Sequence, residues 1–556
     1  MLARRWTLLT AALAILVGYV LSIANLRFGD LNQDEGWYLL AARSVSEGKL
    51  PYRDFAFTQG PMLPMVYSLA NPLVAKFGVA GGRIFTSWLA AAAALLATFL
   101  AGRIAPPRHR HVARAVAITL IAVNAYHSYF TAIVKTYSLC ALFLAAAFFA
   151  LSFVTEKRGW IAAALGGFLL AAAAATRISS GAALAATGLV FLLNRKILGD
   201  SKWISFGIGG ALGLAIFLLP WLFIAPVGFK FGIFEYHTLR SAGGLLPALI
   251  YKAGFISRLV NGWLFAIIAA AALIAFRFLF PTLGNSATAN FQPLETRGNP
   301  VALAIWLSIG AISLVHFSAP FPYDDYEVPL FPLFAAALAA GLVKTISSVC
   351  DESRLPRACG WLLAATFLGS ALAAGSSPMN MDLFVRGRDR IWWRMKDEPS
   401  LAKLHRVAKI IRTEFPNAKE MLTQDSYLAV ETGMRVPPGF EMGPFSYFPK
   451  FSDGRAAQLH VLNEKSLRDA LQNSKAPIAA ISGYGLSIAC PEVSELSKEE
   501  QQELQARLRS RYALMGETPN FGQGNSTLKL FQLLDGAPWR AQKERPDPRT
   551  RFEAVP

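Results

Sequence analysis

Charged residues are scarce in this chain of 556 residues: they make up 16% of it, against about 25% in soluble domains. Cysteine is scarcer still, and Cys140, Cys350, Cys359 and Cys490 lack the spacing of a metal motif or a disulfide framework. Hydrophobic residues make up 54% of the chain, and its mean hydropathy is +0.38. These values exclude an ordinary soluble enzyme, a disordered protein, a collagen and a coiled coil.

The scarcity of charge is confined to the first two thirds of the sequence. Residues 1–375 hold 28 basic and 14 acidic residues, whereas the much shorter segment 376–556 holds 26 and 22. We therefore predict a membrane module over 1–375, a small α/β domain over 376–536 and a disordered tail over 537–556. In the α/β domain we expect helices at 401–413, 463–472 and 498–512, strands at 478–482 and 527–533, and a turn at 522–524.

Apolar stretches close to the roughly 20 residues that cross a bilayer recur throughout the membrane module. The shorter stretch 61–77 contains three prolines, and we expect it to lie at the membrane interface. The run that begins at Trp6 is too long for the apolar region of a signal peptide, which predicts an uncleaved anchor. The eleven expected spans are 6–26, 83–102, 114–131, 137–155, 159–176, 178–194, 203–226, 256–277, 301–318, 327–347 and 358–375. The expected fold class is thus a mostly α, polytopic membrane protein.

The distribution of lysine and arginine orients these spans. With the N-terminus in the cytoplasm, the cytoplasmic segments hold 16 of the 28 basic residues of the module but only five of its 14 acids, as the positive-inside rule requires. The parity of the spans then places the 376–536 domain outside the cytoplasm. The net charge of +18 is mostly a signal of topology, and we expect no nucleic-acid partner.

Acidic residues are absent from the middle of every expected span, whereas ion pumps and channels usually carry carboxylates there. The acids gather instead in three outer loops, 27–82, 227–255 and 319–326, and at the start of the span that follows. They are Asp30, Asp34, Glu35, Glu47, Asp54, Glu235, Asp324, Asp325 and Glu327. We therefore expect chemistry at the outer face of the membrane.

The first outer loop carries two adjacent acids at the start of an expected amphipathic helix. Asn32 is a plausible N-cap and Glu35 its capping-box partner. Asp34 and Glu35 either only stabilise the positive end of this helix or also carry chemistry, and the helix pattern alone leaves both interpretations open.

The order of short motifs in this loop is similar to that of a known fold family. The Asp34-Glu35 pair, Tyr38, the segment Gly48–Asp54 and the Gly60-Pro61-x-Leu63-Pro64 motif resemble the GT-C glycosyltransferases that use polyprenyl-phosphate sugars. The closest branches include aminoarabinose transferases and protein O-mannosyltransferases. The resemblance covers about residues 1–375, and it implies a GT-C-like bundle followed by an extracytoplasmic domain.

A second segment, Phe234–Arg240, resembles the part of aminoarabinose transferases in which an arginine contacts the lipid phosphate. The resemblance assigns this role to Arg240. The chain departs from the family at Gln59, because the lysine usual before the proline pair is missing, and Lys49, Arg53 and Arg83 are left open as replacements. The turns at Thr176-Arg177 and at 135–137 are further candidates for contact with the donor.

The resemblance implies an inverting transfer of a sugar from a polyprenyl-phosphate donor to an acceptor hydroxyl on a glycan, a lipid or a protein. Its setting would be the outer face of a bacterial cytoplasmic (inner) membrane, among membrane lipids and in the synthesis of envelope glycans such as lipopolysaccharide. Asp34 is the expected base, with Glu35 as its helper or alternative. Binding of the donor phosphate is assigned to Arg240, Lys49, Arg53 and Arg177. Substrate binding is assigned to Tyr38, Tyr52, Asp54, Glu235, His237, Tyr323, Asp324 and Asp325.

No cofactor is implied with certainty. The fifth outer loop, with Tyr323, Asp324 and Asp325, suits a sugar or a divalent cation, but it equally suits an interfacial aromatic loop. His127 and His316 are expected to be structural. A transporter or flippase for a lipid-linked glycan and an O-antigen polymerase or ligase remain as alternative functions.

Overall fold

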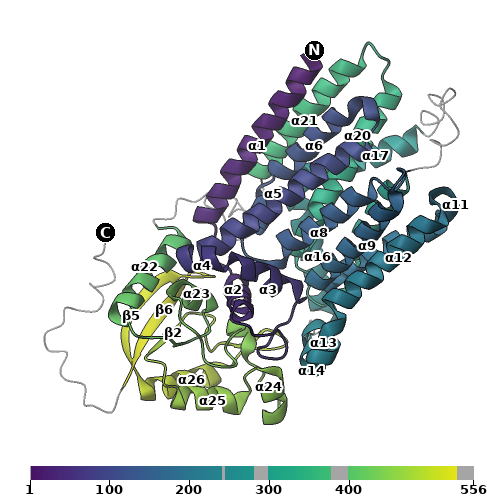
Figure 1. Ribbon diagram of the computed structural model, residues 1–556. Helices are drawn as coiled ribbons and strands as arrows, with labels where there is room; N and C mark the ends of the chain where they lie inside the picture. Colours follow the sequence, from purple (N-terminus) through teal and green to yellow (C-terminus); the bar gives the residue numbers. More distant parts are fainter. Residues whose placement is uncertain (1, 241–243, 281–298, 377–397, 535–556) are drawn as a thin grey trace.

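The protein consists of a helical bundle, a layer of short helices at one end of it, and a C-terminal domain packed against that layer (Figure 1). A computed structural model describes residues 2–240, 244–280, 299–376 and 398–534, and the tail expected at 537–556 lies outside them. Helix α1 (Leu2–Phe28) begins at the end of the bundle farthest from the C-terminal domain.

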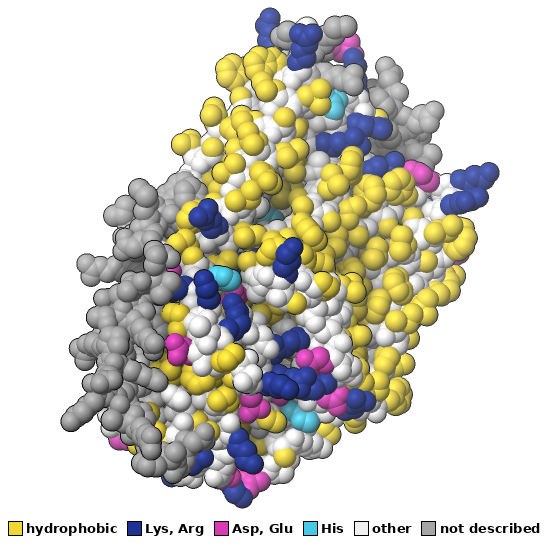
Figure 2. Space-filling view, turned by 60° about the vertical axis from the view of Figure 1, so that its left-hand side comes forward, with side chains coloured by type: hydrophobic (Ala, Val, Ile, Leu, Met, Phe, Trp, Pro, Cys, Tyr) yellow, Lys and Arg dark blue, Asp and Glu magenta, His cyan; other side chains and the backbone are white. Residues whose placement is uncertain are grey.

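The bundle is made of long apolar helices whose outer side chains are hydrophobic. Figure 2 shows hydrophobic side chains covering the bundle, while charged side chains gather at its far end and on the C-terminal domain. Besides α1 it contains α5 (Val79–Ile104), α6 (Arg110–Ala122), α7 (Ala125–Ala132), α8 (Thr136–Leu151), α9 (Gly159–Thr176), α10 (Gly181–Leu193), α11 (Arg195–Leu198), α12 (Asp200–Phe217), α13 (Leu219–Ile224), α14 (Pro226–Lys230), α16 (Leu245–Gly262), α17 (Leu264–Leu279), α19 (Pro300–Ser318), α20 (Phe331–Val349) and α21 (Leu355–Gly375).

Fewer helices have the length and hydropathy of a membrane span than the eleven expected. Within the described residues seven helices are long and apolar enough to span a membrane, or up to nine if each of two bent pairs is one span. The stretch 114–131 is divided because the Asn124 side chain caps a new helix, α7, by accepting from the His127 amide. The stretch 256–277 breaks at Trp263, where α16 and α17 meet at 91°. Hydropathy does not detect such breaks. The number of apolar helices that remain still makes the chain a multi-pass membrane protein.

Loops that the sequence assigns to the cytoplasm lie together in space. Arg103 donates to the Glu156 carboxylate, and Arg108 donates to Glu352. These contacts join the loops 102–114, 155–159 and 344–357, which supports the expectation that all three emerge on one side of the membrane.

Short helices form the layer between the bundle and the C-terminal domain. The capping box expected at the start of α2 (Gln33–Ser46) is present, with Asn32 and Glu35 bonded reciprocally. The expected interfacial stretch 61–77 forms α3 (Met62–Tyr67), η1 (Ser68–Ala70) and α4 (Asn71–Phe77). These pieces are too short to span a bilayer.

The C-terminal domain is the small α/β unit expected from the sequence. Its main sheet has the strand order β1-β2-β6-β5, in which β1 and β2 are parallel and the other pairs antiparallel. The expected helices and strands are present, and the sequence missed the remaining elements, among them β5, whose pairing with β6 is interrupted by register shifts. The elements are α22 (Ser400–Glu414), β1 (Met421–Thr423), α23 (Ser426–Thr432), η6 (Gly443–Ser446), α24 (Asp453–Leu459), α25 (Glu464–Asn473), β2 (Ile478–Ile481), β3 (Ile488–Ala489), β4 (Ser494–Glu495), α26 (Lys498–Arg511), β5 (Tyr512–Phe521) and β6 (Ser526–Leu533).

Helix α2 and the C-terminal domain share one hydrophobic core, in which Trp37 and Leu40 of α2 join Tyr427 and Leu428 of α23. The two helices approach closely because position 36 is glycine: a Cβ atom there would lie 2.1 Å from the Tyr427 backbone nitrogen. The C-terminal domain therefore holds α2 in a fixed place at the end of the bundle.

Candidate functional site

A polar cavity of about 330 Å³ lies where α2, the break between α7 and α8, the loop helix η5 (Asp324–Leu330) and the C-terminal domain meet. Its wall contains four cationic side chains and two carboxylates. The lining residues are Asn32, Gln33, Asp34, Trp37, Tyr38, Tyr126, Phe130, Lys135, Tyr137, Arg177, Tyr236, Arg240, Tyr251, Arg258, Tyr323, Asp325, Tyr326, Phe445, Val493 and Gln523.

Asp34 projects into this cavity from the first turn of α2. Its side chain is 26% exposed, and Oδ2 lies 3.1 Å from the Lys135 ammonium. Oδ1 accepts a hydrogen bond of 3.2 Å from the Trp37 indole. The carboxylate is therefore oriented by two groups yet still open to a molecule in the cavity, as a general base must be.

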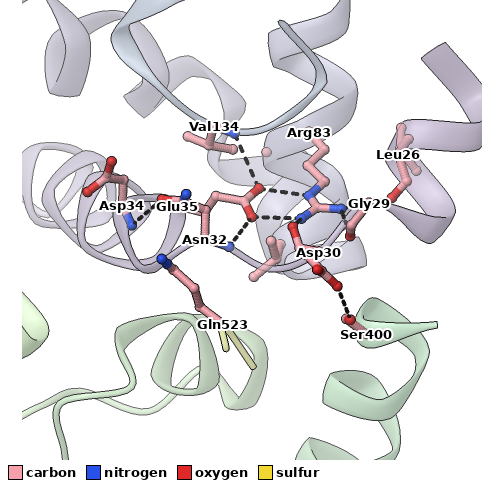
Figure 3. Close-up of polar contacts among 12 residues, drawn as sticks. Leu26, Gly29, Asp30, Asn32, Asp34, Glu35, Arg83, Val134, Ser400 and Gln523 are labelled. Carbon is pink, nitrogen blue, oxygen red and sulfur yellow. Dashed lines mark hydrogen bonds and ion pairs between the residues drawn. The ribbon is translucent and has the colours of Figure 1, made fainter. Parts of the chain in front are cut away.

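Glu35 lies on the other side of the helix and does not line the cavity (Figure 3). Its side chain and that of Arg83 are both fully buried, and two 2.7 Å bonds join them. The backbone N–H groups of Asn32 and Val134 also donate to the Glu35 carboxylate. All of its hydrogen-bonding capacity is thus used within the protein, and this arrangement favours a structural role over the expected one as helper or alternative base.

Arg83 is equally committed, because it also donates to the carbonyl oxygens of Leu26, Gly29 and Asp30. It ties the end of α1 to the start of α2 and is not available to a phosphate. The replacement of the missing lysine by Arg83 is therefore excluded by burial.

Lys135 occupies the break between α7 and α8, where the chain bends by 108°. Its ammonium lies 2.9 Å from the Asp325 carboxylate on η5 as well as 3.1 Å from Asp34. The Tyr137 hydroxyl donates to the same Asp325 oxygen over 2.8 Å. The sequence pointed to 135–137 only through its position in an outer turn, and the bend is what brings it between two acids.

Three arginines enter the cavity from different segments of the chain. Arg177 lies against the Tyr137 and Tyr326 rings, 5.2 and 4.8 Å from their centroids, and Arg240 lies 5.3 Å from the Phe321 centroid. The Nε atoms of Arg177 and Arg240 are buried and bond to no group in the described parts of the chain. Arg258, on α16, was missed because no motif surrounds it.

Two predicted substrate-binding tyrosines, Tyr38 and Tyr323, lie on the cavity wall. Burial, reinforced by the Asp34 carboxylate, raises the pKa of Tyr38 well above its usual value. Its hydroxyl therefore stays protonated and remains a hydrogen-bond donor at neutral pH.

The loop 49–54, expected to contact the substrate, lies away from the cavity. Lys49 is exposed, and Arg53 forms an exposed ion pair with Asp54. Asp54 also accepts from the Leu50 amide and so stabilises its own turn. Tyr52 packs edge-on against Trp221 and Phe229, so Tyr52, Arg53 and Asp54 support the loop.

Glu235 and His237 also have structural roles. Glu235 bonds Lys230 and, on the C-terminal domain, Arg455. Burial, together with the charge of Arg240, lowers the pKa of His237 to about 4, so the ring is neutral and Nε2 donates to the Thr58 carbonyl over 3.2 Å. These contacts join the first and fourth outer loops to each other and to the domain.

A divalent cation does not fit the carboxylates of the cavity. Asp325 and Asp34 already bond the Lys135 ammonium, and the Asp324 side chain lies outside the described residues. Where the chain is described, no three His, Cys, Asp or Glu side chains are placed to hold a metal ion. His316 instead contacts Glu327 and Ser179, both at 2.8 Å, which agrees with a structural role.

The C-terminal domain completes the cavity through three loops that no motif had singled out as functional. They contribute Phe445, Val493 and Gln523. Gln523, at the expected turn between β5 and β6, accepts a hydrogen bond of 2.8 Å from the Gln33 amide through its Oε1 atom. Figure 3 shows it reaching from the domain toward the start of α2, beside Asp34.

Comparison with solved structures identifies proteins of the same architecture. The chain is similar to ArnT from Cupriavidus metallidurans bound to undecaprenyl phosphate, with a TM-score of 0.55 and 13% identity over 94% of this chain and 98% of that one. The apo form of ArnT gives a TM-score of 0.55 and 12% identity over 95% and 98%. No family model and no curated protein sequence matches. The chain thus has the GT-C fold that the sequence predicted for residues 1–375, and the likeness to ArnT extends over the C-terminal domain as well.

Proposed function

We propose that this protein is an integral membrane glycosyltransferase that moves a sugar from a polyprenyl-phosphate donor to an acceptor hydroxyl. The observation that carries the proposal is the juxtaposition in one cavity of an open carboxylate, Asp34, with the guanidinium groups of Arg177, Arg240 and Arg258. A base and a cationic site for a phosphate leaving group are what such a transfer needs. The undecaprenyl phosphate bound to ArnT supports this class of donor.

The arginines are suited to the phosphate of the donor. A guanidinium binds phosphate oxygens through two parallel N–H groups and stays charged at any physiological pH. The buried Nε atoms of Arg177 and Arg240 lack a protein partner within the described residues, which leaves an N–H on each for an anion. Lys135 bonds the two carboxylates, so the donor phosphate is assigned to the arginines.

The reaction is a single displacement at the anomeric carbon. Asp34 takes the proton from the acceptor hydroxyl while the oxygen of that hydroxyl forms a bond to the anomeric carbon. The bond from that carbon to the phosphate oxygen breaks on the opposite face, and its electron pair leaves with the polyprenyl phosphate. The arginines stabilise this developing negative charge, and the configuration of the sugar is inverted.

We place the cavity at the outer face of a bacterial cytoplasmic membrane. The basic loops held together by Arg103 and Arg108 lie at the far end of the bundle from the C-terminal domain. By the positive-inside rule those loops are cytoplasmic, which puts the cavity and the domain on the other side. An acceptor from the cell envelope is consistent with this placement.

The test is to incubate the purified protein with labelled undecaprenyl-phosphate sugars and a cell-envelope extract. We expect free undecaprenyl phosphate to appear together with labelled sugar on the acceptor, and Asp34→Asn to abolish both. A flippase would move the lipid-linked sugar across a vesicle membrane without cleaving it. Cleavage absent for every common sugar, with folded protein, would overturn the proposal.

A further inference from the structure

The Lys135 ammonium contacts both carboxylates of the cavity, a pairing that the sequence did not predict. Nζ lies 3.1 Å from Asp34 Oδ2 and 2.9 Å from Asp325 Oδ2, and the lysine side chain is only 9% exposed. It comes from the bend between α7 and α8, whereas the acids come from α2 and η5. Three elements far apart in the sequence thus meet at one nitrogen atom.

Two carboxylates that share a cavity repel each other and resist joint ionisation. Proteins commonly resolve this conflict with a divalent cation, which takes carboxylate oxygens as ligands. Here the ammonium stands where such a cation would bind, and the Tyr137 hydroxyl supplies a further donor to Asp325. A burial of 91% of the lysine side chain would be costly without these two partners.

We propose that Lys135 is a built-in cation that takes the place of a divalent metal ion between Asp34 and Asp325. It acts as a positioning residue: its ion pair with Asp34 aims that carboxylate into the cavity, while Asp325 and Tyr137 hold the ammonium. This inference rests on the proposed function only in treating Asp34 as the base. The presence of a cation site between Asp34 and Asp325 does not depend on which reaction the protein catalyses.

The first test measures metal binding and needs no substrate. Removing the ammonium by Lys135→Ala leaves two carboxylates facing an open space, so this variant is expected to bind Mn²⁺, detected by the electron paramagnetic resonance of the bound ion. Lys135→Met fills the same space without a charge and is the matched control, expected to bind none. The double variant Lys135→Ala/Asp325→Asn removes one ligand and should bind Mn²⁺ much more weakly.

The second test measures transfer activity in the same variants. Wild-type activity is expected to survive chelation by EDTA, and Lys135→Ala to lose activity on the order of 100-fold, as when a general base is impaired. Addition of Mg²⁺ or Mn²⁺ should raise the transfer activity of Lys135→Ala about tenfold or more. It should not change the activity of Lys135→Met. Lys135→Arg keeps the charge and should retain partial activity without metal.

The two proposals fail in different ways. Mn²⁺ bound between the carboxylates in the wild type, or no difference in Mn²⁺ binding between Lys135→Ala and Lys135→Met, would overturn the built-in cation whatever the activity. Absence of transfer by the wild type, with Mn²⁺ binding confined to Lys135→Ala, would overturn only the proposed function.

Discussion

Asp34 and Glu35 are neighbours in the sequence, yet they face different sides of the first turn of α2 (Figure 3). Successive residues of a helix point about 100° apart, so an acidic pair at a helix start divides between two environments. Asp34 is 26% exposed in the cavity, whereas Glu35 is fully buried against Arg83. We therefore expect separate roles for the two acids: Asp34 as the proposed base, and Glu35 in holding the start of α2 in place.

Asp34→Asn is expected to remove the base without disturbing the fold. Transfer should fall on the order of 100- to 10,000-fold in kcat, while the KM for the donor and the melting temperature in detergent stay close to wild type. Steady-state kinetics and thermal unfolding measure these quantities. Glu47→Gln is the control, because that acid lies in the same loop, is exposed, and pairs with Arg435. Full activity in Asp34→Asn would contradict the assignment.

Glu35→Gln is expected to show the reverse pattern. It leaves the Arg83 guanidinium buried without its counter-ion, and breaking such a pair costs about 3–5 kcal/mol. The melting temperature should therefore drop sharply, with activity lost in proportion to unfolded protein. Active-site titration of the remaining folded fraction distinguishes this from loss of a base. An unchanged melting temperature with lost turnover would restore Glu35 as a catalytic candidate.

Arg240→Ala is expected to weaken donor binding. A hydrogen bond to a charged group contributes about 1.5–3 kcal/mol, so the Kd for undecaprenyl phosphate should rise roughly 10- to 100-fold. Native mass spectrometry or a lipid-competition assay measures this. Arg455→Ala is the control, because Arg455 bonds Glu235 on the exposed side of the same loop. Equal effects of the two substitutions would mean that Arg240 contributes only general surface charge.

Gln523→Ala tests whether the C-terminal domain is part of the site. Its Oε1 atom accepts from the Gln33 amide in the first turn of α2, and losing a helix cap costs about 1 kcal/mol. We expect kcat to fall several-fold because Asp34, the next residue, is less firmly held. Gln523→Glu keeps the acceptor oxygen and should retain the fold of α2. Thr527→Ala, at an exposed position of the next strand, should have no effect on kcat.

Stability should depend on pH through Glu441 in the C-terminal domain. Burial raises the pKa of this carboxyl from 4.5 to about 7, so the folded state holds its proton more tightly than the unfolded state. The stabilisation is complete below about pH 4.5 and is lost as the pH rises through about 7. It amounts to as much as about 3 kcal/mol.

Glu441→Gln carries no charge and keeps an oxygen for the Gly439 amide, which now donates to the carboxylate over 2.7 Å. Thermal unfolding between pH 4 and 9 should therefore show a wild-type decline across this window that the variant lacks. Parallel pH profiles for the two proteins would show that Glu441 does not titrate as stated.

Composition and periodicity predicted most of the architecture because they report on burial. Apolar stretches became the bundle, and the helix expected at 401–413 became α22. The sequence missed the breaks at Asn124 and Trp263, because a break changes the direction of a helix without changing its hydropathy. It missed β5 because the bulges that bend this strand also disturb its alternating pattern.

The site was predictable where a residue's type is tied to its chemistry and its place in the chain. Asp34, Arg177, Arg240, Tyr38, Tyr323 and Asp325 line the cavity as expected. Residues such as Arg258 and Gln523 were not predictable, because each stands in an ordinary local pattern and reaches the cavity only through the packing of α16 or the β5–β6 turn. Glu35, Lys49 and Arg53 do not line the cavity, because proximity in sequence does not determine which face a side chain occupies.

The sequence alone determined that this is a multi-pass membrane protein with a separate α/β domain, because hydropathy and charge are sums over a segment and need no partner. Only the tertiary structure decided which acid is open and which is buried, and which cations meet them. Lys135 lies 101 residues from Asp34 and 190 from Asp325 along the chain, and a contact between such distant groups exists only after the bundle, the outer loops and the domain have packed together. Function resides in that packing, because the free energy of a charge depends on the groups that fold around it.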